Sequence, residues 1–450
     1  MPNFLNKLTR SLLLLSAAGI SWGFVSCSGD YHYETPKISG EAFDPSLPVT
    51  VSEILPDSGG YLTQFVIKGS NFGTDLSKID IIFGGNRKAT VVNSNGTTLY
   101  GICPKQEDGN NQVTVRVDSL GEPIACPNTF KYTKVERVSV LAGKTGSTGA
   151  GYVDGSPIDA RFNHVTGVGV VTGNNVIVME GASSRVRMIS ETDNKVLTLA
   201  TGCPNFGHPA VSADRKRLFA IQVNQPHAVY SFDQVNNWSP KRITTSLQYK
   251  DTSGTINTVD GDIYACACDD EGKYLYFRDH MARFGRMEIA NPENVEILND
   301  KCGEVDKNVS YLAWSPVDKC FYMSVENKQG IYKVSHDGKN VEQYAGFNGV
   351  GADDGPKMDA KFNSPRGMAF DMDGNMYIAN REGRTIRKIG HNDGMVTTVA
   401  GQAGYTDNNK AEGLPIEVTF NHPWDIAVDD EGNFYIGEYW GNDVRKFAIE

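Results

Sequence analysis

The sequence has no excess of basic charge and only one long hydrophobic run. Its 54 Asp and Glu residues outnumber its 43 Lys and Arg residues, which gives a formal net charge of −11. Because a protein that binds the phosphate backbone of nucleic acids needs a basic surface, that class of function is excluded. The apolar run, residues 11–25, is shorter than an ordinary membrane-spanning helix, so a polytopic membrane protein is excluded as well.

Several signatures of catalytic and metal sites are also missing. The chain has no Cys-x-x-Cys pair, so a structural zinc site is not expected. It has neither a Gly-x-Ser-x-Gly elbow nor a phosphate-binding Gly-rich loop followed by Lys. A disulfide between Cys103 and Cys126 stays open, because sequence alone does not decide pairing. Cys266 and Cys268 lie two residues apart on a predicted strand, share one face, and are interpreted as core residues.

Residues 1–26 predict a secretory signal peptide, in which Lys7 and Arg10 precede an apolar core. The small residue before Cys27 resembles the cleavage box of bacterial lipoproteins. The resemblance implies cleavage before Cys27 and diacylglycerol on its thiol, and two or more acyl chains anchor a protein stably. Ordinary secretory cleavage is the alternative. Residues 27–47 are then expected to form a polar tether.

Residues 48–133 alternate short β-rich runs with turns that contain glycine. Because no segment has helical periodicity, a β-sandwich is predicted. Its predicted strands include residues 65–67, 79–83, 89–92 and 112–117. Ile67-Lys68-Gly69-Ser70-Asn71-Phe72-Gly73, together with Phe83-Gly84-Gly85, resembles the immunoglobulin-like IPT/TIG domain. The resemblance implies a spacer, and direct ligand binding is the alternative.

The remaining residues, 134–450, contain an internal repeat. Segments 162–168, 362–368 and 420–426 align with one another, and each begins with Phe-Asn. Weaker copies between them give six units, spaced as the four-stranded blades of a β-propeller are. These units begin near residues 162, 206, 262, 309, 362 and 420. Residues 137–143 end in Ala-Gly like a fourth strand, so they are expected to close the ring as the outer strand of the sixth blade.

The repeat resembles the NHL family in its Phe-Asn-x-Pro opening and its Asp-x-x-Gly-Asn-x-Tyr-Ile segment. The expected fold is therefore all-β, with an IPT/TIG sandwich followed by a six-bladed NHL-type propeller. The middle three units depart from the family pattern. Propellers usually bind ligands on the face that carries the loops leading into the inner strands. Three of those loops are long here: 144–161, 347–361 and 402–419.

Aromatic residues concentrate on this face, mainly in the sixth unit. Exposed aromatic rings stack on sugars or planar groups at a small entropic cost, and arginines donate bidentate hydrogen bonds to carboxylates or hydroxyls. The candidate ligand-binding residues are Trp424, Trp440, Tyr439, Tyr405, Tyr152, Arg366 and Arg381. The alternative is structural, with Trp424 filling the central channel and the tyrosines packing beneath loops.

Three histidines, His164, His208 and His422, share one repeat position in units one, two and six. Three imidazoles with an open position are typical of catalytic zinc, so these histidines are the candidate metal ligands of a lyase or hydrolase. Apart from this alternative, with zinc or calcium as the metal, no cofactor and no catalytic residue is expected. Three arginines recur at one strand position and are predicted to contact backbone or acidic groups within each blade: Arg187, Arg387 and Arg445.

The order of lipid anchor, tether, IPT/TIG domain and NHL-type propeller resembles surface lipoproteins of Bacteroidetes that accompany glycan-import systems. The resemblance implies a non-catalytic protein of the outer membrane, lipid-anchored and exposed on the cell surface, which captures a glycan or another nutrient. Its implied partners are a TonB-dependent transporter and the substrate-binding lipoprotein of that transporter. A scaffold for protein–protein interaction is the second interpretation, and the metal-dependent enzyme is the third.

Overall fold

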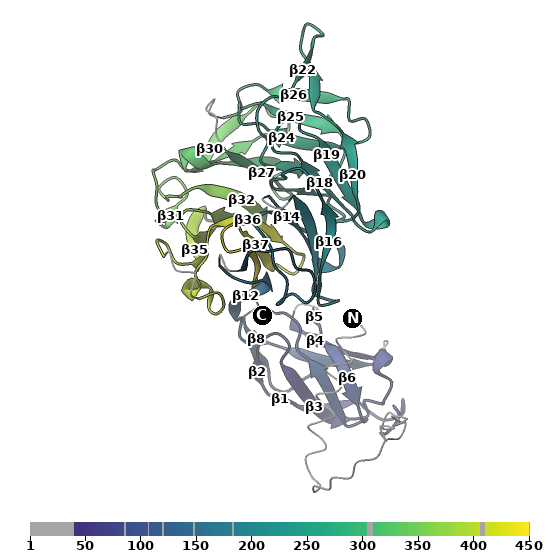
Figure 1. Ribbon diagram of the computed structural model, residues 1–450. Helices are drawn as coiled ribbons and strands as arrows, with labels where there is room; N and C mark the ends of the chain where they lie inside the picture. The colour runs from purple at the N-terminus through teal and green to yellow at the C-terminus, as the bar shows by residue number, and fades with distance from the viewer. Residues whose placement is uncertain are drawn as a thin grey trace, which may run out of the picture. The chain divides into compact units, whose positions relative to one another are not determined.

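The computed structural model describes residues 40–84, 87–106, 108–118, 121–146, 149–181, 184–303, 309–405 and 410–449. The chain divides into two compact units between Val135 and Glu136 (Figure 1). The expected signal peptide and the expected lipidation site, Cys27, lie outside the described residues. Among residues 40–449, apart from the gaps named above, no helix is long and apolar enough to span a membrane.

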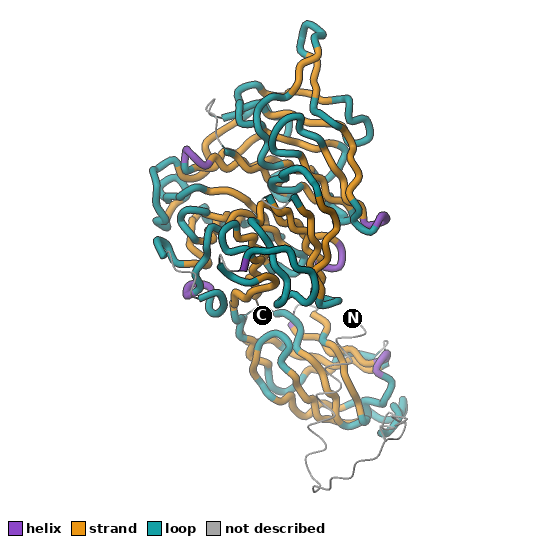
Figure 2. Tube along the Cα trace, viewed as in Figure 1, coloured by secondary structure: helices purple, strands orange, loops and turns teal. Residues whose placement is uncertain are grey.

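Strands make up nearly all of the regular structure, as Figure 2 shows. The helical segments of the described residues are single 3₁₀ turns: η1 (Leu76–Lys78), η4 (Thr172–Asn174), η5 (Gln234–Asn236), η6 (Glu326–Lys328) and η7 (Pro415–Glu417). The structure thereby confirms the predicted all-β fold class, with the sandwich first and the propeller second.

The first unit is a β-sandwich. One sheet contains β1 (Thr50–Leu55), β3 (Gln64–Ser70), β7 (Thr98–Ile102) and β6 (Thr90–Ser94); the other contains β10 (Ile124–Ala125), β9 (Val113–Val117), β4 (Ile79–Phe83) and β5 (Arg87–Lys88). A smaller sheet contains β2 (Ser58–Gly59), β11 (Phe130–Tyr132) and β8 (Gly109–Asn111). Alternate residues of β4 and β9 are buried, as expected for strands with one face on a core. In that core, the rings of Phe65 and Phe130 each lie 5.3 Å from the ring of Phe83.

The Gly69–Gly73 segment has a clear structural role. A Cβ at Gly69 would lie 2.0 Å from the carbonyl oxygen of Thr50, so only glycine fits against the neighbouring strand. The side chain of Asn71 donates to the carbonyl oxygens of Asp44 and Leu47, at 2.8 and 2.7 Å. Phe43 packs against the sandwich core. Residues 40–47, which the sequence analysis assigned to the tether, are therefore docked on the sandwich.

Among its described residues, the second unit contains six sheets of four or five strands, which we number as blades, and one two-stranded sheet. Blade one contains β13 (Val165–Val171), β14 (Asn175–Glu180), β15 (Arg185–Ser190) and β16 (Lys195–Thr201); blade two contains β17 (Ala210–Val211), β18 (Arg217–Ile221), β19 (Val229–Asp233) and β20 (Pro240–Thr244). Blade three contains β23 (Cys266–Cys268), β24 (Tyr274–Arg278), β25 (Phe284–Glu288) and β26 (Val295–Asn299), after a hairpin of β21 (Gln248–Lys250) and β22 (Ile256–Thr258).

Blade four contains β27 (Ser310–Ser315), β28 (Cys320–Val325), β29 (Gly330–Val334) and β30 (Val341–Gly346). Blade five contains β32 (Pro365–Phe370), β33 (Met376–Asn380), β34 (Thr385–Ile389) and β35 (Met395–Gly401), with the short β31 (Gly355–Pro356) at its outer edge. Blade six contains β36 (Pro423–Val428), β37 (Phe434–Glu438) and β38 (Asp443–Ile449), and its outer strand is β12 (Glu136–Gly143). Figure 1 shows β12 close to the yellow C-terminal strands, so the two ends of the propeller share one sheet.

The propeller core lies between neighbouring blades. One apolar cluster joins blades four and five, a second joins blades five and six, and a third joins blades six and one. Phe162, Phe362 and Phe420, which open the repeats, are fully buried in these clusters. Each blade therefore depends on its neighbour to cover its apolar surface, which explains why the motif recurs.

The two faces of the propeller carry different connections. The loops that lead into the inner strands, and the loops that join second to third strands, lie on one face, which we call the loop face. The turns that join first to second strands lie on the other, which we call the turn face. In one of these turns, Asp371 accepts from the backbone N–H of Asn375 at 2.8 Å and from the Asn375 side chain at 2.9 Å. The Asp-x-x-Gly-Asn motif therefore shapes a turn.

The described cysteines are all free thiols in the structure. Cys103 and Cys126 are buried in the sandwich core, and burial raises the pKa of Cys103 to about 12 and that of Cys126 to about 11. Cys266 and Cys268 lie in the core between blades two and three, which confirms their interpretation as core residues.

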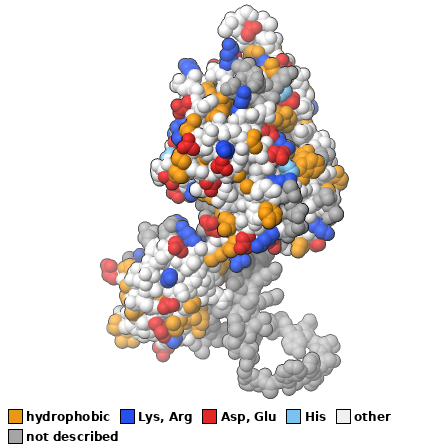
Figure 3. All heavy atoms as spheres, turned by 90° about the vertical axis from the view of Figure 1, so that its left-hand side faces the viewer, with side chains coloured by type: hydrophobic (Ala, Val, Ile, Leu, Met, Phe, Trp, Pro, Cys, Tyr) orange, Lys and Arg blue, Asp and Glu red, His pale blue; other side chains and the backbone are white. Residues whose placement is uncertain are grey.

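On the side of the molecule seen in Figure 3, acidic and basic side chains are interspersed.

Candidate ligand-binding face

Four planar groups from three neighbouring blades stack on the loop face. The guanidinium of Arg366, at the start of β32, lies 3.5 Å from the ring centre of Trp424, near the start of β36. The Trp424 ring lies 4.0 Å from the Tyr439 ring, with 17° between the planes. The Tyr439 ring lies 4.3 Å from the His164 ring, with 7° between the planes. We call Arg366, Trp424, Tyr439 and His164 the planar stack.

The repeat explains why the planar stack forms. Arg366 and Trp424 occupy equivalent positions in adjacent blades, so their side chains meet at the centre of the loop face. Tyr439 follows β37 and lies in the loop between the second and third strands of the same blade as Trp424. Each contact of this kind contributes about 0.5–1.5 kcal/mol beyond the area that it buries. These rings are expected from the sequence to receive a ligand, but in the structure most of their faces are covered by one another.

The inner end of the planar stack is anchored by charge. Arg366 is only 5% exposed, and its Nη2 lies 2.8 Å from Oε2 of Glu326. It also donates to the hydroxyl of Tyr311 at 3.3 Å. Arg381 pairs with Oε1 of the same Glu326 and with Glu382. The expected role of Arg366 is therefore corrected: it is a buried ion-pair partner, because Glu326 supplies the carboxylate that the sequence analysis expected from a ligand.

The outer end of the planar stack meets an exposed ring. Trp440 is 46% exposed, and its ring stands nearly perpendicular to two rings. It lies 4.6 Å from the ring of His164, at 84°, and 5.0 Å from the ring of Tyr439, at 88°. Burial lowers the pKa of His164, which favours the neutral imidazole against these rings. Two fixed rings therefore contact the ring of Trp440, and the rest of its surface is exposed to solvent.

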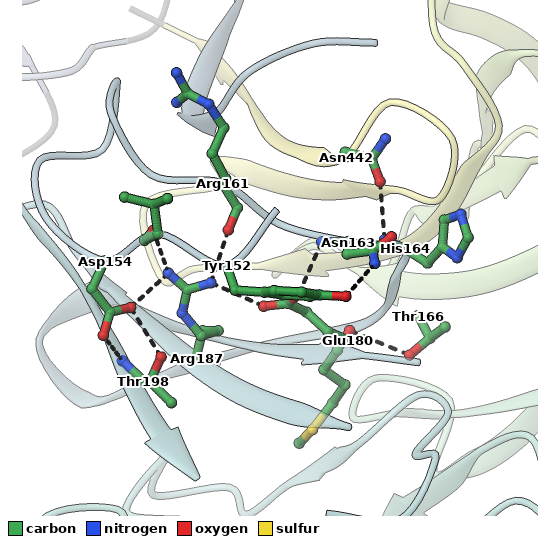
Figure 4. Close-up of polar contacts among 12 residues, drawn as sticks. Tyr152, Asp154, Arg161, Asn163, His164, Thr166, Glu180, Arg187, Thr198 and Asn442 are labelled. Carbon is green, nitrogen blue, oxygen red and sulfur yellow. Dashed lines mark hydrogen bonds and ion pairs between the residues drawn. The ribbon is translucent and has the colours of Figure 1, made fainter. Parts of the chain in front are cut away.

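The other two candidate tyrosines lie elsewhere on the loops. Tyr152 is 51% exposed, its hydroxyl accepts from the side chain of Asn163 at 2.9 Å, and the guanidinium of Arg185 lies 4.2 Å from its ring centre. Figure 4 shows Tyr152, Asn163 and His164 on the same side of blade one. Tyr405 is 56% exposed, and within the described residues no ring contact joins it to the planar stack.

The three candidate metal ligands have different neighbours. His208 Nδ1 lies 2.7 Å from Oδ1 of Asp425, His422 Nδ1 lies 2.9 Å from Oδ1 of Asn421, and His164 belongs to the planar stack. Over the part of the chain that the structure describes, no three His, Cys, Asp or Glu side chains come together as metal ligands. The expected convergence of the histidines is therefore corrected.

Backbone geometry distinguishes His208 from the other two histidines. His164 and His422 both adopt a left-handed backbone, with φ of +56° and +63°, as does Ser364 at the same repeat position in blade five, with φ of +60°. His208 is not among the left-handed residues of the described chain, and its backbone N–H donates to the carbonyl oxygen of Tyr264. Blade two therefore presents its histidine differently from blades one and six.

Three fully buried arginines pair with acidic side chains beneath the loop face. Figure 4 shows Arg187 between Asp154 and Glu180, with N–O distances of 2.6 and 3.1 Å. Glu180 also accepts from the backbone N–H of Asn163, which fixes the loop that enters β13. At the same strand position, Arg387 pairs with Asp354 and Arg445 pairs with Glu438. These pairs confirm the prediction that this recurring position contacts acidic groups within the blade.

Two residues that organise the loop face were missed in the sequence. Glu326 lies in blade four, where the family motif fades, so no pattern marked it. Asp425 stands where the aligned units have Gly167 and Gly367, and this departure from the repeat could have marked Asp425 as a residue of the site. Its carboxylate accepts from the backbone N–H of Val168 at 2.8 Å as well as facing His208, so it joins blade six to blades one and two.

Two family models match the chain. Residues 48–132 match the IPT/TIG domain, and residues 264–430 match the Teneurin NHL domain. Teneurin-1 of Gallus gallus is 35% identical over 141 residues, which cover 27% of this chain. The match spans only 5% of the length of that relative.

Solved structures match both units together. An auxiliary nutrient binding protein from Bacteroides ovatus has 21% identity and a TM-score of 0.63, and the match covers 91% of this chain and 100% of the other, which supports the fold. A protein of unknown function from Bacteroides thetaiotaomicron has 35% identity and a TM-score of 0.71, with the same coverage of 91% and 100%. Because this match covers 91% of the chain at 35% identity, the chain belongs to the same family as the Bacteroides thetaiotaomicron protein.

Proposed function

We propose that this protein is a non-catalytic ligand-binding lipoprotein that captures a glycan for an outer-membrane uptake system. In this proposal Cys27 carries the lipid, the IPT/TIG domain is a spacer, and the propeller is exposed at the cell surface. The ligand passes to a TonB-dependent transporter and its substrate-binding lipoprotein. The nutrient-binding role of the Bacteroides ovatus protein is consistent with this proposal.

The proposal rests mainly on the ring of Trp440, which is both exposed and held in place. Its ring is 46% exposed and is held by edge contacts to His164 and Tyr439, which are themselves fixed in the planar stack. A ring held in place in the free protein loses little conformational freedom when a sugar stacks on it. The stacked residues therefore act as supports, and Trp440 is the residue that contacts the glycan.

Tyr152 extends the same surface. It lies in the loop before blade one, and the side chain of Asn163 donates to its hydroxyl. Asn163 directly precedes His164, so Tyr152 and Trp440 contact consecutive residues of one loop segment. Two exposed rings with hydrogen-bonding groups between them suit an oligosaccharide better than a single small molecule.

Affinity electrophoresis on a panel of polysaccharides tests the proposal. The chain from Ser28 to Glu450 is compared with Trp440→Ala and with Tyr405→Ala, a control with similar exposure outside the planar stack. We expect retardation by at least one glycan, lost in Trp440→Ala and kept in Tyr405→Ala. Retardation that survives Trp440→Ala would refute the site. No retardation by any glycan would refute glycan capture and favour a protein-interaction scaffold.

A further inference from the structure

The propeller has a cavity in its central channel, away from the planar stack. Its volume is about 460 Å³, and it is lined by the inner strands of all six blades. Small side chains make the room, and they include Gly169, Ala210, Ala267, Ala313 and Ala427. Cavities of this size, with mainly apolar walls and a few polar groups, are typical sites for small molecules.

The cavity occupies the half of the channel next to the turn face. Its lining residues come from the second halves of the inner strands, such as Met368–Phe370 and Ile426–Val428, and from the turns that follow. Towards the loop face the channel is filled by Arg366, Tyr311 and Trp424. The cavity is therefore reached from the turn face and is separate from the proposed glycan surface.

A half-buried histidine lines the inner end of the cavity, which we call the floor, and a fully buried aspartate outside the lining holds it. His208 lines it, and the Nδ1 of His208 lies 2.7 and 2.8 Å from the two carboxylate oxygens of Asp425, whose side chain is fully buried. Because Nδ1 is directed at Asp425, Nε2 is the ring nitrogen that remains for a ligand. In a neutral imidazole, a proton on Nδ1 leaves Nε2 as a hydrogen-bond acceptor.

The charged residues at the rim make ion pairs, although Nη1 of Arg215 has no hydrogen-bond partner among the described residues. Arg215 lies 2.8 Å from Asp430, and Asp270 accepts from the indole N–H of Trp314 at 2.9 Å and pairs with Lys319. A charged ligand would have to compete with these pairs. The rim therefore favours a neutral ligand, and the floor favours one that donates a hydrogen bond.

We propose that the central channel binds a neutral small molecule with an apolar body and a hydroxyl group, which donates to Nε2 of His208. The apolar body lies against the alanine and valine side chains of the inner strands, and the hydroxyl lies at the floor. This binding is independent of glycan capture on the loop face, so either proposal stands or fails alone.

Calorimetric titration with para-cresol and with toluene tests the proposal, because the two probes differ by one hydroxyl. We expect the chain from Ser28 to Glu450 to bind one para-cresol, about fivefold more tightly than toluene, as one net hydrogen bond would give. In spectra of ¹⁵N-labelled histidine, the Nε2 resonance of His208, assigned by its loss in His208→Gln, should shift with para-cresol and not with toluene.

Two variants test whether para-cresol binds in the channel. Ala427→Leu fills the cavity, and Ala213→Trp narrows the mouth at an exposed position, so it spares the fold. Both should weaken para-cresol binding at least tenfold, whereas Trp440→Ala should leave it unchanged. Absence of saturable para-cresol binding, or binding that neither channel variant weakens, would overturn the proposal. Equal binding of the two probes would overturn the role of His208.

Discussion

Glu326 and Arg366 form a buried ion pair across two blades, with 2.8 Å between Oε2 and Nη2. Their side chains are only 10% and 6% exposed. The other oxygen of Glu326 pairs with Arg381, so one carboxylate from blade four holds two guanidiniums from blade five. Since Arg366 lies against Trp424, this carboxylate also fixes the inner end of the planar stack.

Glu326→Gln should destabilise the propeller. The substitution keeps the shape of the side chain and removes its charge, which leaves Arg366 buried without a full counter-charge. Removing one partner of a buried ion pair costs about 3–5 kcal/mol. We expect a loss near the lower end of that range in the unfolding free energy, about 3 kcal/mol, because Arg381 is less buried and keeps its pair with Glu382. Urea denaturation followed by tryptophan fluorescence measures it.

Glu296→Gln is the matched control for that prediction. Glu296 pairs with Arg286 at 2.8 Å, but its side chain is 59% exposed. Exposed pairs contribute about 0–1 kcal/mol, so this variant should unfold close to the wild type. Similar losses in the two variants would contradict the idea that burial of the Glu326 pair matters.

The fold followed from the sequence because its signals are local and repeated. Phe162, Phe362 and Phe420 mark equivalent buried positions, and the Asp371 turn and its copies follow the inner strands at a fixed spacing. A repeat in which each blade covers its neighbour gives the same pattern in each copy. The all-β class and the propeller could therefore be predicted from a few segments.

The candidate site could be predicted only in part, because its geometry depends on contacts between blades. The sequence placed Trp424, Tyr439 and Trp440 on one face, and the structure has them in contact there. It did not indicate that Arg366 turns inward, because its partner Glu326 belongs to a blade without the motif. The direction of a long side chain at a loop depends on which neighbour supplies the opposite charge, and no spacing rule contains that information.

Cys27→Ser should release the protein from the membrane. If Cys27 carries the lipid, removal of its thiol prevents acylation and leaves no stable anchor. We expect the variant to lose label from radioactive palmitate and to move from the membrane to the soluble fraction. Ser28→Ala, which keeps the thiol, is the control and should stay labelled and membrane-bound. A labelled or membrane-bound Cys27→Ser protein would contradict lipidation at this residue.

Glu438 makes the stability of the propeller depend on pH. Its side chain is fully buried, and burial raises its pKa from the ordinary value of 4.5 to about 8, although Arg445 opposes the shift. Asp443 shares the same Arg445, which leaves two carboxylates for one guanidinium. Between these pKa values the folded state binds more protons than the unfolded state, so stability falls as pH rises. The contribution is complete below the ordinary pKa of 4.5 and is lost as pH rises through about 8.

Glu438→Gln should flatten this dependence. An amide oxygen can accept from the backbone N–H of Asn421 as the carboxylate does, because Asn380 accepts from Asn363 in this way at the same position of blade five, at 2.7 Å. Urea unfolding at pH 5, 6.5 and 8 should show wild-type stability falling with pH, with a smaller fall in the variant. Glu296→Gln removes an exposed acid and should keep the wild-type slope. An unchanged slope in Glu438→Gln would show that Glu438 is ionised throughout this range and that Arg445 outweighs its burial.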